Sequence, residues 1–110
     1  MATPTIVIGD GWSQLVTLKA GTAAYSIDSG ATVKSAIIAT DHSALESTVV
    51  TITEADPGND WTNGVVMLEF DTTSLAGLSA GLSKIEIEVT ESGDKNTWFG
   101  VVKVVNGLIP

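Results

Sequence analysis

The sequence predicts an all-β protein whose seven or eight short strands form a sandwich or a small barrel. Three observations predict this fold class. The apolar residues are mostly Val, Ile, Leu and Ala, and Thr is abundant, a mixture typical of pleated sheets. Apolar and polar residues alternate with a period of two in several runs, and clusters of Gly, Asp, Asn and Pro separate these runs at short intervals. Since 110 residues suit one domain, we expect residues 1–110 to form a single β-sandwich domain.

The first half of the chain contains four predicted strands, and turn-forming residues follow the first three of them. The most convincing is the fourth, where Val33, Ser35 and Ile37 alternate with the residues of the opposite face. In the second strand, Val16 and Leu18 share one face. The four predicted strands are Thr5–Ile8, Trp12–Lys19, Tyr25–Ile27 and Thr32–Ala39.

The second half contains four more predicted strands after a polar loop over Asp41–Ser47. The clearest is amphipathic, because three apolar residues from Ile85 to Val89 alternate with acidic ones. Turn clusters over residues 56–60 and 91–96 separate neighbouring strands. The predicted strands are Thr48–Glu54, Val65–Phe70, Ile85–Val89 and Thr97–Val105.

A leucine-rich segment joins the second and third of these strands. Leu75, Leu78 and Leu82 have helical spacing, but Gly77 and Gly81 interrupt the pattern. We therefore expect one capped turn there and no long helix.

The charge composition disfavours two classes of partner. The net charge is −8, with five lysines and no arginine. Proteins that bind nucleic acid need cations to neutralise phosphates, and an anionic membrane attracts basic surfaces. We therefore expect neither nucleic acid nor a membrane as a partner. The chain has no cysteine for a disulfide and no apolar run long enough for a transmembrane helix. Because the residues from Met1 to Pro4 lack the basic start and apolar core of a signal peptide, we expect none there.

The residues that carry catalytic chemistry are too few for an enzyme of a common type. His42 is the single histidine, it lies in a polar loop, and no serine has a nucleophile-elbow pattern around it. Zinc sites generally need several His or Cys ligands. The cluster Asp56–Asp60 offers oxygen ligands for calcium, but it lacks the spacing of an EF-hand and is better interpreted as a turn. We expect no catalytic residues, no metal site and no cofactor.

The three tryptophans, Trp12, Trp61 and Trp98, have two interpretations. Exposed indoles can form a carbohydrate platform or the centre of a protein interface. Alternatively, each indole fills the core or closes one end of the sandwich.

Two strands are apolar on both faces, which predicts a second buried surface. If Trp98, Gly100, Val102 and Val104 point inward, then Phe99, Val101 and Val105 point outward. Val65 and Met67 give the strand Val65–Phe70 the same character. A sandwich strand in water needs only one apolar face. We predict a subunit interface that contains these five outward residues; the alternative is that residues 1–8 fold over them.

Several segments resemble a known family of modules. They are Gly9-Asp-Gly-Trp-Ser-Gln-Leu-Val-Thr-Leu18, Trp61-Thr-Asn-Gly-Val-Val-Met-Leu-Glu-Phe-Asp-Thr-Thr-Ser-Leu75, Gly81-Leu-Ser-Lys-Ile-Glu-Ile-Glu-Val-Thr90, the Gly93-Asp94 turn and Trp98-Phe-Gly-Val-Val102. In their nature and order they resemble the immunoglobulin-like β-sandwiches of tailed-bacteriophage structural proteins, such as the N-terminal domain of the baseplate upper protein and tail-fibre modules.

The resemblance implies an immunoglobulin-like antiparallel sandwich in a non-enzymatic virion protein, made in the cytoplasm of a bacterial host. Its expected role is protein–protein attachment in a baseplate, tail fibre or head decoration, as a homo-oligomer (a ring or trimer) that binds other virion proteins. One alternative is a carbohydrate-binding module that uses exposed Trp and loop Asp residues. Others are a small hydrolase that uses Asp56, Asp60 or Glu residues, and a chaperone or inhibitor.

Overall fold

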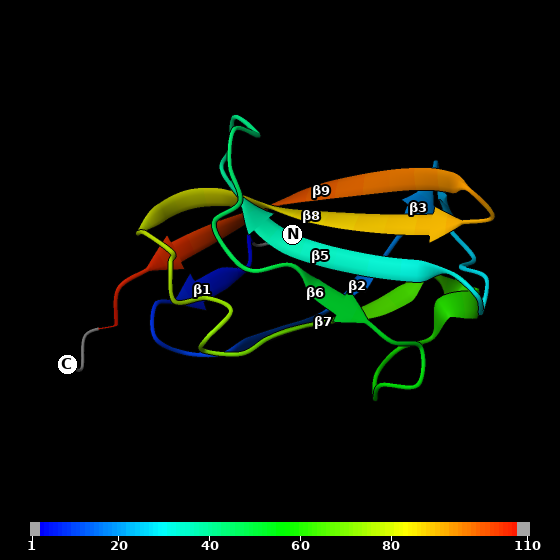
Figure 1. Ribbon diagram of the computed structural model, residues 1–110, viewed down its shortest axis with the longest axis horizontal. Coiled ribbons are helices and arrows are strands. Elements are labelled where there is room, and N and C mark those ends of the chain that lie inside the picture. Colours follow the sequence, from blue (N-terminus) through cyan, green and yellow to red (C-terminus); the bar gives the residue numbers. More distant parts are fainter. Residues whose placement is uncertain (1–2, 108–110) are drawn as a thin grey trace.

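The larger of two packed sheets has five strands in the order β1-β9-β8-β5-β6 (Figure 1). The computed structural model describes residues 3–107. Strands β8 and β9 form a long hairpin at the centre of this sheet, and β5 pairs with β8 over its whole length. The strands of the larger sheet are β1 (Thr5–Val7), β5 (Thr32–Ile38), β6 (Val50–Ile52), β8 (Gly81–Glu91) and β9 (Asp94–Val105).

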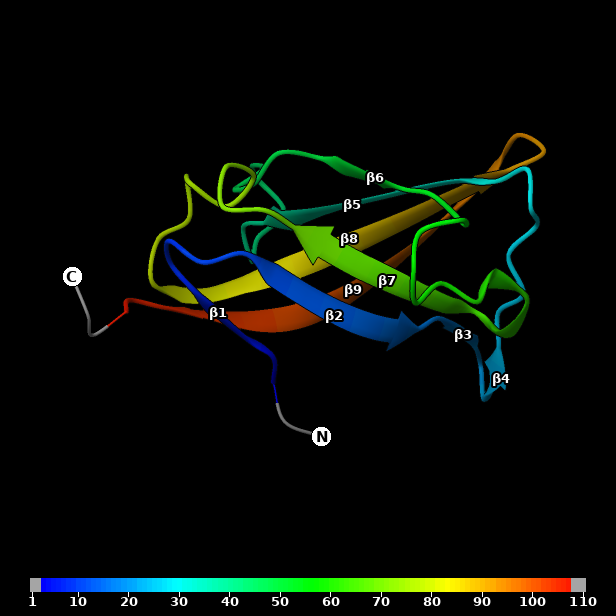
Figure 2. The same cartoon turned by 90° about the horizontal axis from the view of Figure 1, so that it is seen from below.

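The smaller sheet has two strands, β2 (Trp12–Thr17) and β7 (Val65–Phe70), paired antiparallel (Figure 2). The short hairpin of β3 (Lys19–Ala20) and β4 (Ala23–Ala24) follows β2, and the 3₁₀ turn η1 (Trp61–Asn63) precedes β7. In chain order, β2 and β7 correspond to the B and E strands of an immunoglobulin sandwich, and β5, β8 and β9 to C, F and G. The predicted all-β sandwich is confirmed.

One pairing, that of β1 with β9, is an exception to the predicted antiparallel sandwich. Strand β1 lies parallel to β9, with Thr5 opposite Lys103 and Val7 opposite Val105. The backbone N–H of Lys103 donates to the carbonyl of Pro4. Because Pro4 has no N–H of its own, the ladder cannot continue in the same way toward the N-terminus.

Several predicted strand boundaries were wrong. The strand predicted over Trp12–Lys19 is interrupted at Leu18, and residues 25–27 form no strand. The predicted loop over residues 91–96 is only a two-residue turn, in which Ser92 and Gly93 have φ of 47° and 89°. These values fit a type I′ turn, whose twist matches that of the flanking strands. Both β8 and β9 are therefore longer than predicted.

The segment after β7 is a capped turn, as predicted. The Asp71 side chain accepts a hydrogen bond from the Ser74 N–H, and this bond holds the pKa of Asp71 below its usual value. Leu75 and Leu78 are buried, whereas Leu82 already belongs to β8 and is 64% exposed. The helical spacing of the three leucines therefore spans a turn and a strand.

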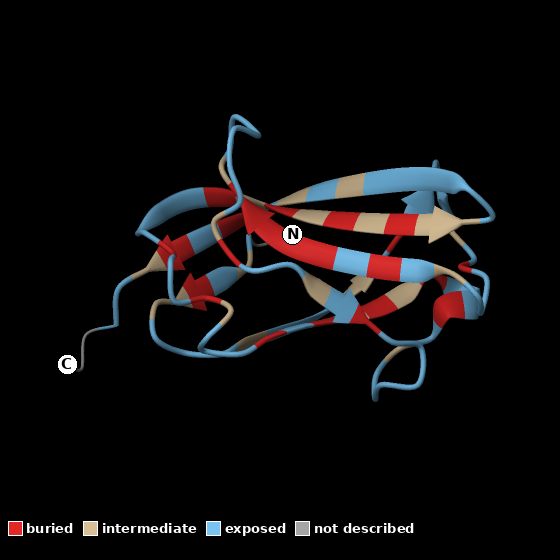
Figure 3. Ribbon diagram, viewed as in Figure 1, coloured by how far each residue is buried: buried red, intermediate tan, exposed pale blue. Residues whose placement is uncertain are grey.

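The core lies between the inner faces of the two sheets. Strand β8 alternates buried and half-buried residues along most of its length, as its sequence predicted (Figure 3). Opposite it, the inner face of β7 is fully buried. Both strands contribute three residues to one hydrophobic cluster: Ile85, Ile87, Val89, Val66, Leu68 and Phe70.

Tyr25, the only tyrosine, links the segment after β4 to the end of β8 through a side-chain hydrogen bond. Its hydroxyl donates a hydrogen bond to the Glu91 carboxylate, which raises the pKa of Tyr25 above 10.0. The folded state thus favours the neutral phenol, so this contribution to stability is complete below pH 10.0 and is lost as the pH rises through the raised pKa. We expect the ultraviolet titration of the tyrosine to show a pKa that falls toward its ordinary value in Glu91→Gln. An identical titration of both proteins would contradict the hydrogen bond.

Candidate protein-binding surfaces

The outer face of the larger sheet has an exposed apolar strip. The register of β8 and β9 places Val101 opposite Lys84 and Leu82 opposite Lys103. The next outward pair along the hairpin is Phe99 opposite Glu86. The side chain of Phe99 is 49% exposed, and that of Val101 is 47% exposed. We call Leu82, Lys84, Glu86, Phe99, Val101 and Lys103 the larger-sheet face. Leu82 was missed in the sequence because its spacing grouped it with the leucines of the preceding turn.

The loop after β5 rests on this face and rises above the sheet (Figure 1). An isolated bridge pairs Leu45 with Ile38. The His42 ring lies 4.6 Å from the Phe99 ring, between centroids, and its Nε2 is 3.0 Å from Lys84 Nζ. Because an ammonium group can only donate, His42 Nε2 is the acceptor in this contact. The loop encloses a shallow hollow of about 320 Å³ lined by Ile38, His42, Ser43, Ala44, Leu45 and Glu86.

The third residue predicted on this strand, Val105, has a different environment. It is half-buried and lies opposite Val7 of β1. Residues 5–7 extend the edge of the sheet and therefore do not cover Phe99 or Val101. The alternative that residues 1–8 fold over the outward face was wrong for residues 3–8, and residues 1–2 lie outside the described part of the chain.

Val65 and Met67 lie on the opposite side of the sandwich. They point outward from β7, because Val66 and Leu68 point into the core. Their neighbours across the smaller sheet are Thr17 and Leu15. The five residues predicted as one interface therefore belong to two separate faces.

The loop before η1 folds onto this second face. A Cβ on Gly58 would lie 2.9 Å from Met67 Cε and 3.3 Å from Leu15 Cδ2. Asn59 Oδ1 accepts hydrogen bonds from the Met67 backbone N–H and from Trp61 Nε1. The loop covers part of Met67 and leaves Leu15 50% exposed. We call Leu15, Val65, Met67 and Glu69, together with Asp56 and Asp60 of the loop, the smaller-sheet face.

The two faces differ in charge. The outward positions of the larger sheet carry four of the five lysines, Lys34, Lys84, Lys95 and Lys103. With the loop that rests on them, they also carry the carboxylates of Asp41, Glu46, Glu86 and Glu88. This side has a formal net charge of 0, while the rest of the chain, with one lysine and nine carboxylates, has −8. The smaller-sheet face contains three carboxylates and no lysine.

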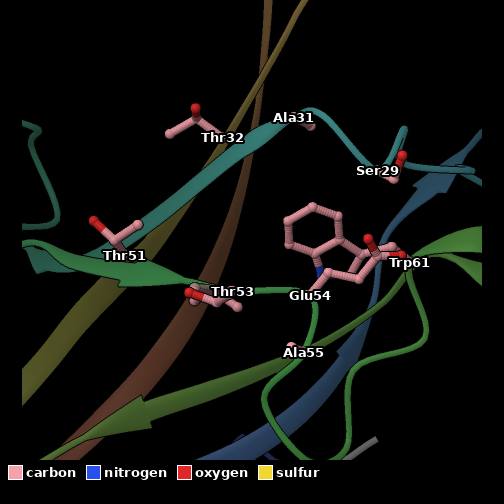
Figure 4. Close-up of a pocket in the computed structure, with 9 residues that line it drawn as sticks. Ser29, Ala31, Thr32, Thr51, Thr53, Glu54, Ala55 and Trp61 are labelled. Carbon is pink, nitrogen blue, oxygen red and sulfur yellow. The ribbon is translucent and has the colours of Figure 1, made fainter.

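None of the three tryptophans is an exposed platform. Trp61 is only 3% exposed, and its indole lies between the segments that carry Ala31 and Glu54 (Figure 4). It forms the inner wall of an open groove of about 580 Å³. Trp12 and Trp98 are half-buried against the core, and Trp98 Nε1 donates to the carbonyl of Lys19. All three indoles therefore pack mainly against the core, so none is the exposed Trp that the carbohydrate-binding alternative uses together with loop Asp residues.

The loop carboxylates make hydrogen bonds within their own turns. Asp56 Oδ2 accepts from the Thr53 N–H, and Asp60 Oδ2 accepts from the Asn63 amide. Between residues 3 and 107, no group of three or more His, Cys, Asp or Glu side chains is arranged to hold a metal ion. No helix in the same stretch is long and apolar enough to cross a membrane.

Comparisons of the chain with models of protein families, with curated proteins and with solved structures find no match. The function proposed below is therefore based on the two faces of the sandwich and on the sequence patterns.

Proposed function

We propose that this protein is a non-enzymatic attachment module that binds other proteins through its larger-sheet face. The observation that carries the proposal is the apolar strip of Leu82, Phe99 and Val101, whose side chains are 47–64% exposed and which is bordered by Lys84, Lys103 and Glu86. Apolar centres with a polar rim are typical of protein interfaces. The β-sheet beneath the strip is paired on both sides of β8, so the binding residues lie on a rigid support.

The particle in which we propose this role is a tailed bacteriophage, as a baseplate, tail-fibre or head-decoration protein. The proposal rests on the resemblance of Gly9–Leu18, Trp61–Leu75 and Gly81–Thr90 to phage modules. The sandwich with immunoglobulin strand order is consistent with that resemblance. The expected partners are other virion proteins and further copies of the chain, and the site of assembly is the bacterial cytoplasm.

Photo-crosslinking from single positions tests the proposed face. We would place p-benzoylphenylalanine at Val101 and, as a control, at Thr73, an exposed residue in the turn between β7 and β8. The protein would be co-expressed with the proteins encoded beside it. We expect a protein adduct from position 101 and none from position 73. Adducts of equal yield from both positions, or none from position 101, would contradict the proposal.

Removing apolar surface from the face should weaken attachment without unfolding the domain. In Phe99→Ser with Val101→Thr, both changes lie at outward positions, so we expect the free energy of unfolding to change by about 1 kcal/mol or less. The affinity for the cross-linked protein should fall at least about tenfold, because interface energy concentrates in a few apolar anchors. Titration calorimetry and urea unfolding measure the two quantities. Unchanged affinity in a folded variant would show that the strip does not bind.

A further inference from the structure

The two faces of the sandwich each have an apolar centre, and the net charges around the two centres are opposite in sign. Each has an apolar centre of three residues: Leu82, Phe99 and Val101 on one side, and Leu15, Val65 and Met67 on the other. The first centre is bordered by Lys84, Lys103 and Glu86, a formal net charge of +1, and the second by the three carboxylates of Asp56, Asp60 and Glu69. A second copy of this chain therefore presents the counterpart of each face.

We propose that copies of this chain bind one another head to tail, with the larger-sheet face of one copy on the smaller-sheet face of the next. This inference rests on the proposed function, since it names a second copy as a protein that the larger-sheet face binds. It also gives Leu15, Val65 and Met67 a partner, which an interface confined to the larger sheet would leave without one.

The charges distinguish this arrangement from a symmetric pair. Two larger-sheet faces in contact would bring together two surfaces of net positive charge, each with two lysines and one carboxylate. Two smaller-sheet faces would bring Asp56, Asp60 and Glu69 together with no cation to neutralise them. Like charges in an interface are unfavourable, whereas lysines opposite carboxylates favour one orientation. The head-to-tail arrangement brings together faces of opposite net charge and also covers both apolar centres.

Head-to-tail contact uses different surfaces on the two partners, so an open assembly keeps one free face of each kind, one at each end. Such contacts produce a ring if the rotation closes and a filament if it does not. A variant that lacks one face can still bind through the other. Two variants that lack different faces are therefore expected to bind each other, although neither binds itself.

The experiment uses two variants, each of which reverses charge on one face at exposed positions. Val101→Glu with Lys103→Glu disables the larger-sheet face, and Leu15→Lys with Glu69→Lys disables the smaller-sheet face. Thr73→Glu is the matched control for a change of charge outside both faces. Urea unfolding establishes that each variant is folded, and light scattering after size-exclusion chromatography gives the mass.

We expect the wild-type chain and the Thr73→Glu control to form oligomers as the concentration rises. Each double variant alone should remain monomeric, with its self-affinity reduced at least about tenfold. An equimolar mixture of the two double variants should assemble, because each contributes the intact face that the other lacks.

Three results would overturn the inference: a wild-type monomer at about 1 mM, a mixture that does not dimerise, or a smaller-sheet variant that assembles like the wild type. If the chain is monomeric but Val101 cross-links to a different protein, the head-to-tail contact is wrong and the proposed function stands. If the crosslinker at position 101 gives no adduct with any protein, including a second copy of this chain, the proposed function fails and the inference fails with it.

Discussion

Replacing Gly64 with alanine is expected to lower the free energy of unfolding by about 2–5 kcal/mol. Gly64 ends the turn η1 with φ of 73°, which costs an L-residue about 1–2 kcal/mol. An added Cβ would also lie 2.7 Å from two backbone oxygens, those of Leu18 and Tyr25. The backbone at these oxygens is held by two hydrogen bonds. The Tyr25 N–H donates to the carbonyl oxygen of Leu18, and the Leu18 N–H donates to the carbonyl oxygen of Gly64. Relieving the clash would break this junction, at about 1–3 kcal/mol for overpacking.

Gly21→Ala is the control for Gly64→Ala. Gly21 has φ of 67°, nearly the same conformation, but nothing lies within 4 Å of its Cβ position. Its replacement should cost only the backbone term, about 1–2 kcal/mol. Urea unfolding followed by circular dichroism measures both. Equal losses for the two variants would show that backbone conformation, and not the crowding at the junction, determines the cost.

Strand positions were predictable where one face of a strand is buried. In β5, Val33, Ser35 and Ile37 are buried as the alternation predicted, and the strand differs from its predicted range by one residue. β7 has the predicted bounds, Val65–Phe70, because its inner residues recur at every second position and Gly64 precedes it. Local periodicity contains this information, since a strand half-buried in a sandwich alternates its environment.

Strand pairing could not be predicted, because it depends on contacts between distant parts of the sequence. Nothing in the local pattern indicates that β1 pairs with β9, nor that this pair is parallel. The same limitation affected the candidate site. Phe99 and Met67 both lie on strands with two apolar faces, and their sequences look alike. Only the assignment of β9 to one sheet and β7 to the other shows that these residues point in opposite directions.

The side chains that contact the candidate interface residues could not be predicted from the sequence either. His42 was expected to be a solvated loop residue, and the structure places its ring beside Phe99, with its Nε2 next to Lys84. This contact brings together parts of the chain more than 40 residues apart. The concentration of lysines on one side of the sandwich follows from the same non-local arrangement, because the lysines are scattered along the sequence.

Replacing Trp61 with alanine is expected to lower the free energy of unfolding by about 3–5 kcal/mol, the usual cost of deleting a buried tryptophan. The indole is 3% exposed and belongs to the main hydrophobic cluster. Its Nε1 also donates a hydrogen bond to Asn59 Oδ1. The same oxygen accepts a hydrogen bond from the Met67 backbone N–H, so the two bonds fix the loop of the smaller-sheet face on β7. Since a domain of this size is stable by only about 5–15 kcal/mol, the variant should be marginally folded. Urea unfolding measures the loss.

Trp61→Phe separates the two functions of the indole, because it keeps an aromatic ring in the core and removes the N–H donor. We expect a loss of about 1 kcal/mol from the missing hydrogen bond, beyond the cost of the smaller ring. The Met67 amide should also exchange with solvent faster than in the wild type, because Asn59 loses one of the two bonds that orient its side chain. Glu69→Gln, an exposed change on the same strand, is the control and should leave that exchange unchanged. If Trp61→Phe leaves the exchange of Met67 unchanged as well, the loop is held by the contact of Gly58 with Met67 and Leu15, and the shape of the smaller-sheet face does not depend on Trp61.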